Sequence, residues 1–315
     1  MREISTSAQI QPQSTSRILM VRPTNFGFNP QTAQSNAFQN EVDSNPVDIA
    51  NSAQQEFDLL ADLLRMVGVE LFIFDQNNAD NPDAVFSNNW VSFHQSGKVV
   101  LYPMMAENRR SERQESILES LNQHFHVEEI IDLTYFEKEG EFLEGTGSMV
   151  FDRRYKIAYA CISPRTNRKV LDKFAEKMGY EVVTFHANDE ANQAIYHTNV
   201  MMCIGDIFAV VCLEALSDPD ERLKLRSILE ETNKYIIELS LDQLKGFTGN
   251  MLLIRNQKQE KVLVMSTKAY ETLTPKQRQI LSDYAALIHT DLTTIETYGG
   301  GSARCMLTEM HLPRS

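Results

Sequence analysis

The C-terminal part of the sequence contains the cysteine whose surroundings best suit nucleophilic chemistry. Cys305 follows three consecutive glycines, Ser302 and Arg304. Glycines permit a tight turn that delivers a side chain to a cleft, and a nearby arginine or backbone N–H groups favour the thiolate. The glycine run lacks both G-x-G-x-x-G and a Walker lysine, which argues against a phosphate-binding loop. The sequence therefore predicts that Cys305 is a nucleophile.

The other three cysteines are typical of packing residues. Cys161, Cys203 and Cys212 stand in the apolar contexts YACIS, MMCIG and VVCLE, where a cysteine behaves as a small hydrophobe. Their spacing fits neither a disulfide scaffold nor a zinc knuckle. His124 and His126 form an H-x-H pair without an acidic or thiol ligand at metal-site spacing. We therefore predict no metal site.

A nucleophilic cysteine needs a proton carrier, and His197 is the best candidate among the seven histidines. It stands just before the apolar run VMMCIG. A polar residue at the end of a buried strand is well placed to face a cleft. Position in the sequence alone does not exclude the other histidines as proton carriers.

Short apolar runs and amphipathic segments predict an α/β fold. Eight runs rich in β-branched and aromatic residues are typical of strands buried on both faces; they are 18–21, 69–74, 98–103, 156–162, 181–185, 207–213, 251–254 and 261–265. Helices are predicted near 48–67, 112–123, 166–178, 219–233 and 275–287. Several strands come in hairpin-like pairs, which favours a mixed sheet over a uniform doubly wound one.

Composition limits the classes of partner. The formal charge is −13, so the electrostatic attraction that drives nucleic-acid binding is missing. The sequence shows neither a signal peptide nor a membrane-spanning run, so we expect a cytoplasmic protein with no membrane partner. We expect a polar N-terminal tail over residues 1–16 and a single domain over 17–315.

Five motifs together resemble the amidinotransferase and deiminase superfamily, whose fold is called pentein. They are FSNNW (86–90), FLEGTGS (142–148), SPRT (163–166), YHTN (196–199) and GGGSARCM (299–306). The resemblance runs from near residue 21 to the C-terminus and is greatest to the bacterial citrulline hydrolase (citrulline ureidase) branch. It implies a five-bladed α/β propeller with pseudo-fivefold symmetry around a central active-site channel, and no cofactor.

The resemblance also implies a role for each motif. Cys305 would be the nucleophile, His197 the proton carrier and Glu144 the carboxylate that orients the substrate. Arg165 would clamp a substrate carboxylate, which suits the planar, bidentate geometry of its guanidinium.

Asparagines replace the aspartates by which related enzymes hold a guanidinium. Asn89, preceded by Asn88, and Asn199 stand at those positions. A guanidinium offers only donors and a positive charge, whereas a ureido group is neutral and has a carbonyl acceptor beside its donors. An amide side chain matches the ureido group and avoids an unpaired buried charge. We therefore predict hydrolysis of citrulline to ornithine, CO2 and NH3 through a thiocarbamate on Cys305.

Two alternatives remain open. An arginine deiminase or an amidinotransferase would use the same residues on a guanidino substrate. A non-catalytic pentein binding protein is a different class, and the joint presence of Cys305, His197 and Glu144 argues against it. In every enzymatic case the partner is a small amino acid, citrulline or arginine-like. Dimers are common in the superfamily, so a homodimer is compatible with the resemblance.

Overall fold

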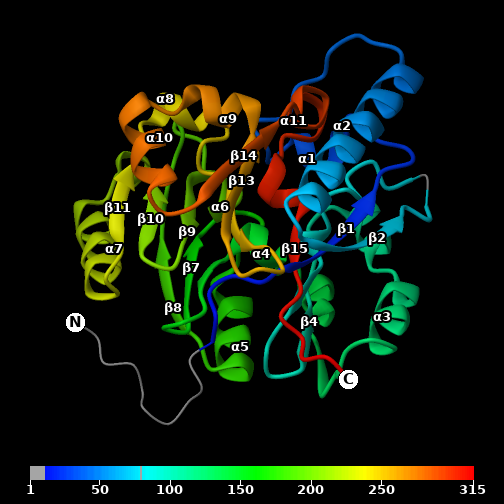
Figure 1. The fold of residues 1–315 in the computed structure, drawn as a ribbon, viewed down its shortest axis with the longest axis horizontal. Coiled ribbons are helices and arrows are strands. Elements are labelled where there is room, and N and C mark those ends of the chain that lie inside the picture. The colour runs from blue at the N-terminus through cyan, green and yellow to red at the C-terminus, as the bar shows by residue number, and fades with distance from the viewer. Residues whose placement is uncertain (1–10, 79) are drawn as a thin grey trace.

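The chain forms five small sheets of three strands each in the computed structural model (Figure 1), which describes residues 11–78 and 80–315. In every sheet the middle strand is antiparallel to one neighbour and parallel to the other. Parallel neighbours require a crossover connection, which here contains a helix in each sheet. The fold is therefore mixed α/β, as predicted. It is built on a repeated structural unit for which the sequence shows no recognisable repeat.

The five units follow one another along the chain, and β15 completes the sheet that β1 begins. The first sheet contains β15 (Thr308–Glu309), β1 (Arg17–Arg22) and β2 (Glu70–Asp75), with crossover helix α2 (Pro46–Met66). The second contains β3 (Val91–Phe93), β4 (Lys98–Leu101) and β5 (Glu129–Asp132), with α3 (Glu115–Asn122). The third contains β6 (Val150–Asp152), β7 (Ile157–Cys161) and β8 (Glu181–Phe185), with α5 (Arg168–Met178).

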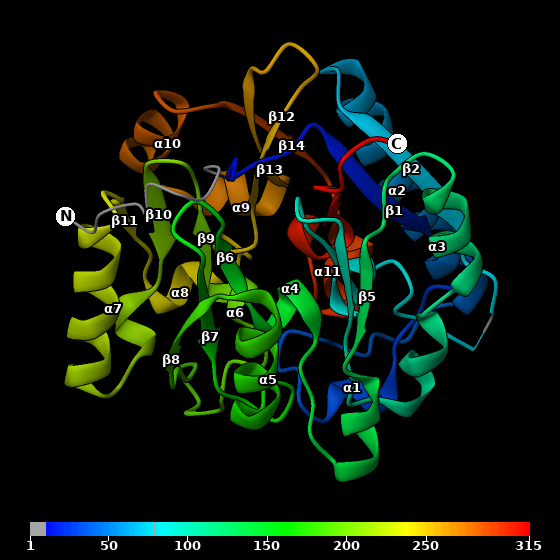
Figure 2. The same ribbon diagram turned by 90° about the horizontal axis from the view of Figure 1, so that it is seen from below.

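The last two sheets repeat this order. The fourth contains β9 (Met202–Ile204), β10 (Phe208–Val211) and β11 (Tyr235–Glu238), with α7 (Pro219–Glu231). The fifth contains β12 (Leu252–Arg255), β13 (Lys261–Ser266) and β14 (Ala286–Thr290), with α9 (Thr267–Thr272) and α10 (Pro275–Ser282). In Figure 2 the crossover helices lie around the outside and the strands lie inside them.

Short helical turns occupy the connections between the sheets and, in three cases (α1, η2 and η4), the crossover within a sheet. The α-helical ones are α1 (Pro30–Ala33), α4 (Gly145–Ser148), α6 (Thr198–Met201), α8 (Leu241–Leu244) and α11 (Thr293–Gly299). The 3-10 turns are η1 (Ser87–Asn89), η2 (Glu107–Glu112), η3 (Thr134–Glu139), η4 (Leu213–Ala215) and η5 (Ala303–Met306). Four of these turns, η1, α4, α6 and η5, directly precede β3, β6, β9 and β15, and these turns or the residue before them hold every predicted site residue except Arg165, which lies between β7 and α5.

The longest crossover helix shows why the helices lie outside the sheets. The Asn45 side chain caps α2 by accepting from the backbone N–H of Val47 at 2.9 Å, and Pro46 occupies the first turn. One stripe of the helix is buried, with Phe57 and Leu64 fully covered by the core. An amphipathic helix of this kind stabilises the fold through its apolar face and leaves the polar face to solvent.

All eight strands predicted from the apolar runs are present. The strands outside those eight runs are short: β3, β5, β6, β9, β11, β14 and β15 contain two to five residues each. The predicted helix at 275–287 is wrong at its end, because α10 stops at Ser282 and the chain enters β14 at Ala286. The remaining predicted helices are found, with ends shifted by a few residues.

The predicted tail over 1–16 lies partly outside the described residues. Of its described part, Gln13, Ser14 and Thr15 are buried. The Gln13 amide donates to the carbonyl of Phe151 at 2.7 Å, and its oxygen accepts from the backbone N–H of Arg153 at 2.8 Å. Packing against the sheets therefore begins before residue 17. Within the described ranges, no helix has the length and apolar character needed to cross a membrane.

Candidate active site

The predicted catalytic residues all lie in turns that precede the first strand of a sheet. Glu144 is the residue before α4, His197 is the residue before α6, and Cys305 lies within η5. Asn88 and Asn89 lie in η1. Residues far apart in the sequence are therefore brought together by the same position in four different repeats.

A glycine fixes the approach of two of these turns. Gly145 has a φ of +47°, and a Cβ built on it would lie 2.3 Å from the carbonyl oxygen of Asn88. Only glycine avoids both the backbone strain and this clash. The E-G pair at 144–145 is therefore required for α4 to pack against η1.

The turns enclose a small buried cavity next to the sulfur of Cys305. His197, Asn89 and Arg165 line it, together with residues that the sequence did not predict, among them Asp83 and Arg109. The cavity has a free volume of about 10 Å³, roughly that of one water-sized probe. This conformation is closed around the nucleophile, and an amino acid requires the surrounding segments to move before it can bind.

Glu144 and His197 form a buried pair. The Nε2 atom of His197 lies 2.8 Å from Oε2 of Glu144, while the other carboxylate oxygen accepts from the backbone N–H of Met105 at 3.0 Å. An ionised carboxylate can only accept, so the proton of a neutral His197 lies on Nε2. The Nδ1 atom then has a free lone pair for proton transfer.

The charges around this pair keep the glutamate ionised and the histidine neutral. Burial alone would raise the pKa of the Glu144 carboxyl, but Arg165, His197 and Arg109 hold it well below its usual range. Burial lowers the pKa of His197 to about 4, although the hydrogen bond to Glu144 opposes this change. At neutral pH His197 is thus positioned as a base rather than an acid.

Two amide groups, rather than an arginine, contact the cysteine sulfur. The Nδ2 atoms of Asn199 and Asn250 donate to Sγ of Cys305 at 3.4 and 3.2 Å. The expectation that Arg304 favours the thiolate is not supported by its contacts. Its guanidinium donates to the carbonyl of Leu307 at 2.7 Å and to Glu309 at 3.1 Å.

Among the asparagines of the site, one amide donor and one amide acceptor have no hydrogen-bond partner in the described part of the chain. Asn89 donates to Oδ1 of Asn88 at 2.9 Å and accepts from Arg109 at 3.0 Å. The Nδ2 atom of Asn88 and the Oδ1 atom of Asn199 are buried without a hydrogen-bond partner among the described residues. Buried groups of this kind call for an explanation, such as a catalytic role or a bound molecule.

The two arginines that line the cavity differ in how fully their charge is compensated. Arg109 makes a bidentate pair with Glu112, at 2.8 and 2.9 Å. Arg165 lies 3.5 Å from Oε2 of Glu144, a carboxylate oxygen that is already shared with His197. Arg165 therefore retains the greater capacity to bind an additional carboxylate.

One segment, residues 30–39, covers the cavity and is bonded to both of its walls. The guanidinium of Arg165 donates to the carbonyl of Thr32 at 2.8 Å and to the hydroxyl of Ser35 at 2.9 Å. On the opposite side, Asn36 donates to the carbonyls of Gly299 and Gly300, each at 3.3 Å. We call this segment the cover, and it joins the SPRT motif to the glycine run.

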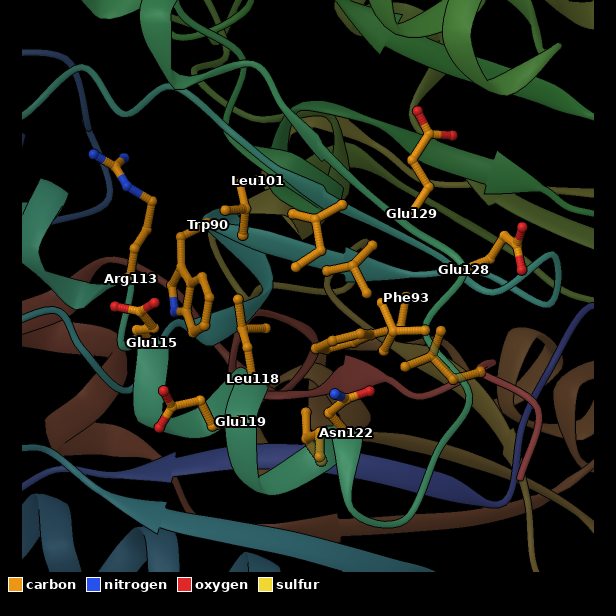
Figure 3. Close-up of a pocket in the computed structure, with 15 residues that line it drawn as sticks. Trp90, Phe93, Leu101, Arg113, Glu115, Leu118, Glu119, Asn122, Glu128 and Glu129 are labelled. Carbon is orange, nitrogen blue, oxygen red and sulfur yellow. The ribbon is translucent and has the colours of Figure 1, made fainter. Parts of the chain in front are cut away.

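A much larger pocket lies elsewhere. It has a volume of about 610 Å³ and lies between the second sheet and α3 (Figure 3), where apolar side chains such as Phe93 and Leu118 form its walls and Glu115 and Glu119 lie at its edge. Trp90, next in the sequence to Asn89, is fully buried at its base. None of the predicted site residues lines this pocket, so its size carries no information about the chemistry.

The described residues contain no group of three or more histidine, cysteine, aspartate or glutamate side chains that could hold a metal ion. Of the H-x-H pair, His126 lies 3.1 Å from Glu128 on the exposed surface. The site is thus composed of a thiol, an imidazole, carboxylates, amides and guanidinium groups.

Asp83, Arg109 and Asn250 are among the site residues that the sequence did not predict. Asp83 accepts from Asn29 at 2.7 Å through Oδ2, while its Oδ1 atom is buried without a described partner. Asp83 stands three residues before the FSNNW motif, and Asn250 stands just before a predicted strand, as His197 does. This position directly before a predicted strand is the one sequence signal that could have identified Asn250 as a site residue.

The repeated three-stranded sheets and the Cys–His–Glu arrangement define the class: the chain is a member of the pentein amidinotransferase and dimethylarginine hydrolase superfamily. More narrowly, it belongs to the family described as "N,N dimethylarginine dimethylhydrolase, eukaryotic", whose model matches residues 22–312. A search of curated proteins finds none that matches.

Solved structures share this fold at low sequence identity. ArgZ, described as an arginine dihydrolase from the ornithine–ammonia cycle in cyanobacteria, superimposes with a TM-score of 0.73 at 18% identity over 94% of this chain. This chain spans only 41% of the full-length ArgZ chain, but it covers 98% of the N-terminal ArgZ domain solved with substrate, with a TM-score of 0.72 and 18% identity. A dimethylarginine dimethylaminohydrolase adduct with S-methyl-L-thiocitrulline gives a TM-score of 0.64 at 15% identity, over 94% of this chain and 99% of that one.

Proposed function

We propose that the chain is a cysteine hydrolase of the C–N bond of a ureido amino acid, with citrulline as substrate and ornithine, CO2 and ammonia as products. The observation that carries this proposal is the pair of unsatisfied amide atoms, Nδ2 of Asn88 and Oδ1 of Asn199. A ureido oxygen would accept from the first and a ureido NH2 would donate to the second. A guanidinium has no acceptor, so it would leave the Asn88 donor unsatisfied and lack a compensating carboxylate at either position.

The amino-acid end of the substrate would be bound by opposite charges. Arg165 would bind the α-carboxylate, because among the described residues the one carboxylate within 4.0 Å of its guanidinium, that of Glu144, lies 3.5 Å away. The buried Oδ1 of Asp83, which has no described partner, would accept from the α-ammonium group. The two groups lie on the same cavity as Cys305.

The chemistry requires one proton to pass from sulfur to nitrogen. His197, neutral at rest, takes the thiol proton as the Cys305 sulfur attacks the ureido carbon, and Glu144 stabilises the imidazolium that forms. The imidazolium returns this proton to the departing nitrogen, which leaves as ammonia and gives a thiocarbamate on the sulfur. Water, deprotonated by His197, then attacks the same carbon. The C–S bond breaks to restore the cysteine, and the carbamate released loses CO2 to give ornithine.

The proposal extends to the architecture. The five sheets would be the blades of a closed propeller, and residues 17–315 would form one catalytic domain with the site in its central channel. The position of the predicted site residues in equivalent turns of four sheets supports this arrangement.

The test is to incubate purified protein separately with citrulline, arginine and N,N-dimethylarginine, and to follow ammonia, ornithine and citrulline. We expect ornithine and ammonia from citrulline. The Cys305→Ala variant should be inactive, whereas Cys212→Ala, which removes a packing cysteine that is also fully buried, should retain activity. Citrulline accumulating from arginine or dimethylarginine, with no ornithine from citrulline, would contradict the ureido assignment.

A further inference from the structure

The fifth sheet contributes a polar residue to the site at the position that the other four sheets use. Asn89, Glu144, His197 and Cys305 each stand in the turn before the first strand of a sheet. In the fifth sheet that place is taken by Asn250, two residues before β12 begins. The repeat therefore points to Asn250 as a residue of the same functional set.

Asn250 is fully buried, and each end of its amide has a defined partner. Its Nδ2 atom donates to Sγ of Cys305 at 3.2 Å and to the carbonyl of Asn199 at 3.1 Å. Its Oδ1 atom accepts from the backbone N–H of Arg304 at 3.0 Å. Rotating the amide by 180° would place oxygen against the Asn199 carbonyl and NH2 against an N–H. The amide is therefore held with a donor facing the sulfur.

The backbone before Asn250 is packed so closely that the amide has little freedom to move. A Cβ on Gly249 would lie 2.3 Å from the carbonyl oxygen of Val200 and 2.7 Å from the carbonyl carbon of Met201. The glycine thus lets the turn before β12 pack directly on α6. Since α6 also contains Asn199, the two amides that contact the sulfur are held on one rigid support.

We propose that Asn250 is a catalytic residue that stabilises the thiolate of Cys305 and fixes its direction of attack; this rests on the proposed function, which makes Cys305 the nucleophile. A hydrogen bond to a charged sulfur is stronger than one to a neutral sulfur. The amide therefore favours the thiolate before attack. It favours it again when the C–S bond of the thiocarbamate breaks and the electron pair returns to sulfur. Because the donor is neutral, it does so without a cation next to the substrate carbon.

The test measures the sulfur directly. The rate of Cys305 alkylation by iodoacetamide is followed by peptide mass spectrometry across a range of pH in the wild type, Asn250→Ala and the equally sized Asn250→Asp. We expect the profiles of both variants to move to higher pH by about one to two units, with alkylation near neutral pH slower by about 10- to 100-fold. The matched control is Asn256→Asp, the same change at the other end of β12, and its profile should equal that of the wild type.

The outcomes separate this proposal from the proposed function. If both Asn250 variants melt near the wild-type temperature and retain its alkylation profile while the wild type hydrolyses citrulline, the role of Asn250 is refuted alone. If the wild type turns over neither ureido nor guanidino compounds while the profiles shift as expected, ureido hydrolysis is refuted and the stabilisation of the sulfur by Asn250 stands.

Discussion

The sharpest prediction concerns Glu144→Gln. The glutamine has one acceptor oxygen where the carboxylate has two, yet three donors face it: Nε2 of His197 at 2.8 Å, the N–H of Met105 at 3.0 Å and the guanidinium of Arg165 at 3.5 Å. At least one donor is therefore left against an NH2 group, which costs about 1–3 kcal/mol of stability. The larger effect is on catalysis, because the imidazolium of His197 loses its buried counter-ion. We expect kcat to fall by about 10²- to 10⁴-fold.

Glu137→Gln is the matched control. Glu137 also accepts from a backbone N–H, that of Met104 at 2.8 Å, and pairs with Arg113 at 2.6 Å, but it contacts no histidine. Both variants should lose a similar amount of thermal stability in calorimetry, and only Glu144→Gln should lose most of its kcat, measured as ammonia release at saturating substrate. Equal losses of kcat in the two variants, or a loss of less than about tenfold for Glu144→Gln, would refute the assigned role.

Four further predictions address substrate choice, proton transfer, stability in acid and access. In Asn199→Asp a carboxylate replaces a donor to the sulfur, so kcat/KM for citrulline should fall by about tenfold or more relative to that for arginine; an unchanged ratio would show that this residue does not read the ureido group. Because the pKa of His197 is lowered to about 4, the acid limb of kcat/KM should lie near pH 4, and a limb near 6.5 would show that burial does not lower the pKa of this imidazole. Burial likewise lowers the pKa of His311 to about 4. The unfolded chain binds protons on both histidines between pH 6.5 and 4 and the folded chain does not, so Tm should fall on acidification through this range, and less steeply in His311→Gln. Asn36→Ala removes the bonds between the cover and the glycine run, so Cys305 should be alkylated faster than in the wild type; an unchanged rate would indicate another route to the sulfur.

The sequence predicted the parts of the fold and site whose signal is local. Continuous apolar runs predicted the eight strands that lie mostly inside the sheets, and the side-chain types at Cys305, His197 and Glu144 are those required for covalent and acid–base chemistry. These three lie as a coherent group in the structure. β11 was missed because its apolar run is only three residues long, and β14 because its start was assigned to the predicted helix at 275–287.

Asn250 and Arg109 were missed for a different reason. An asparagine in the segment GFTGN is unremarkable until the fold places its amide 3.2 Å from a sulfur that is 55 residues further along the chain. Arg109 belongs to an amphipathic, charged segment and became a site residue only through Asn89, which lies 20 residues before it. A role that depends on a partner distant in sequence leaves no mark on its own neighbourhood.

The short strand β15 determines when the site can come into being during synthesis. It begins three residues after Cys305 and pairs antiparallel with β1, where Ile18 faces Glu309. The nucleophile is therefore held by a contact between two of the most distant segments of the chain, which must meet before the sulfur is in place. During synthesis on the ribosome, Cys305 would not be held in its final position until residue 309 had emerged. Proteolytic removal of β15 would abolish activity at the site while leaving the other four sheets intact.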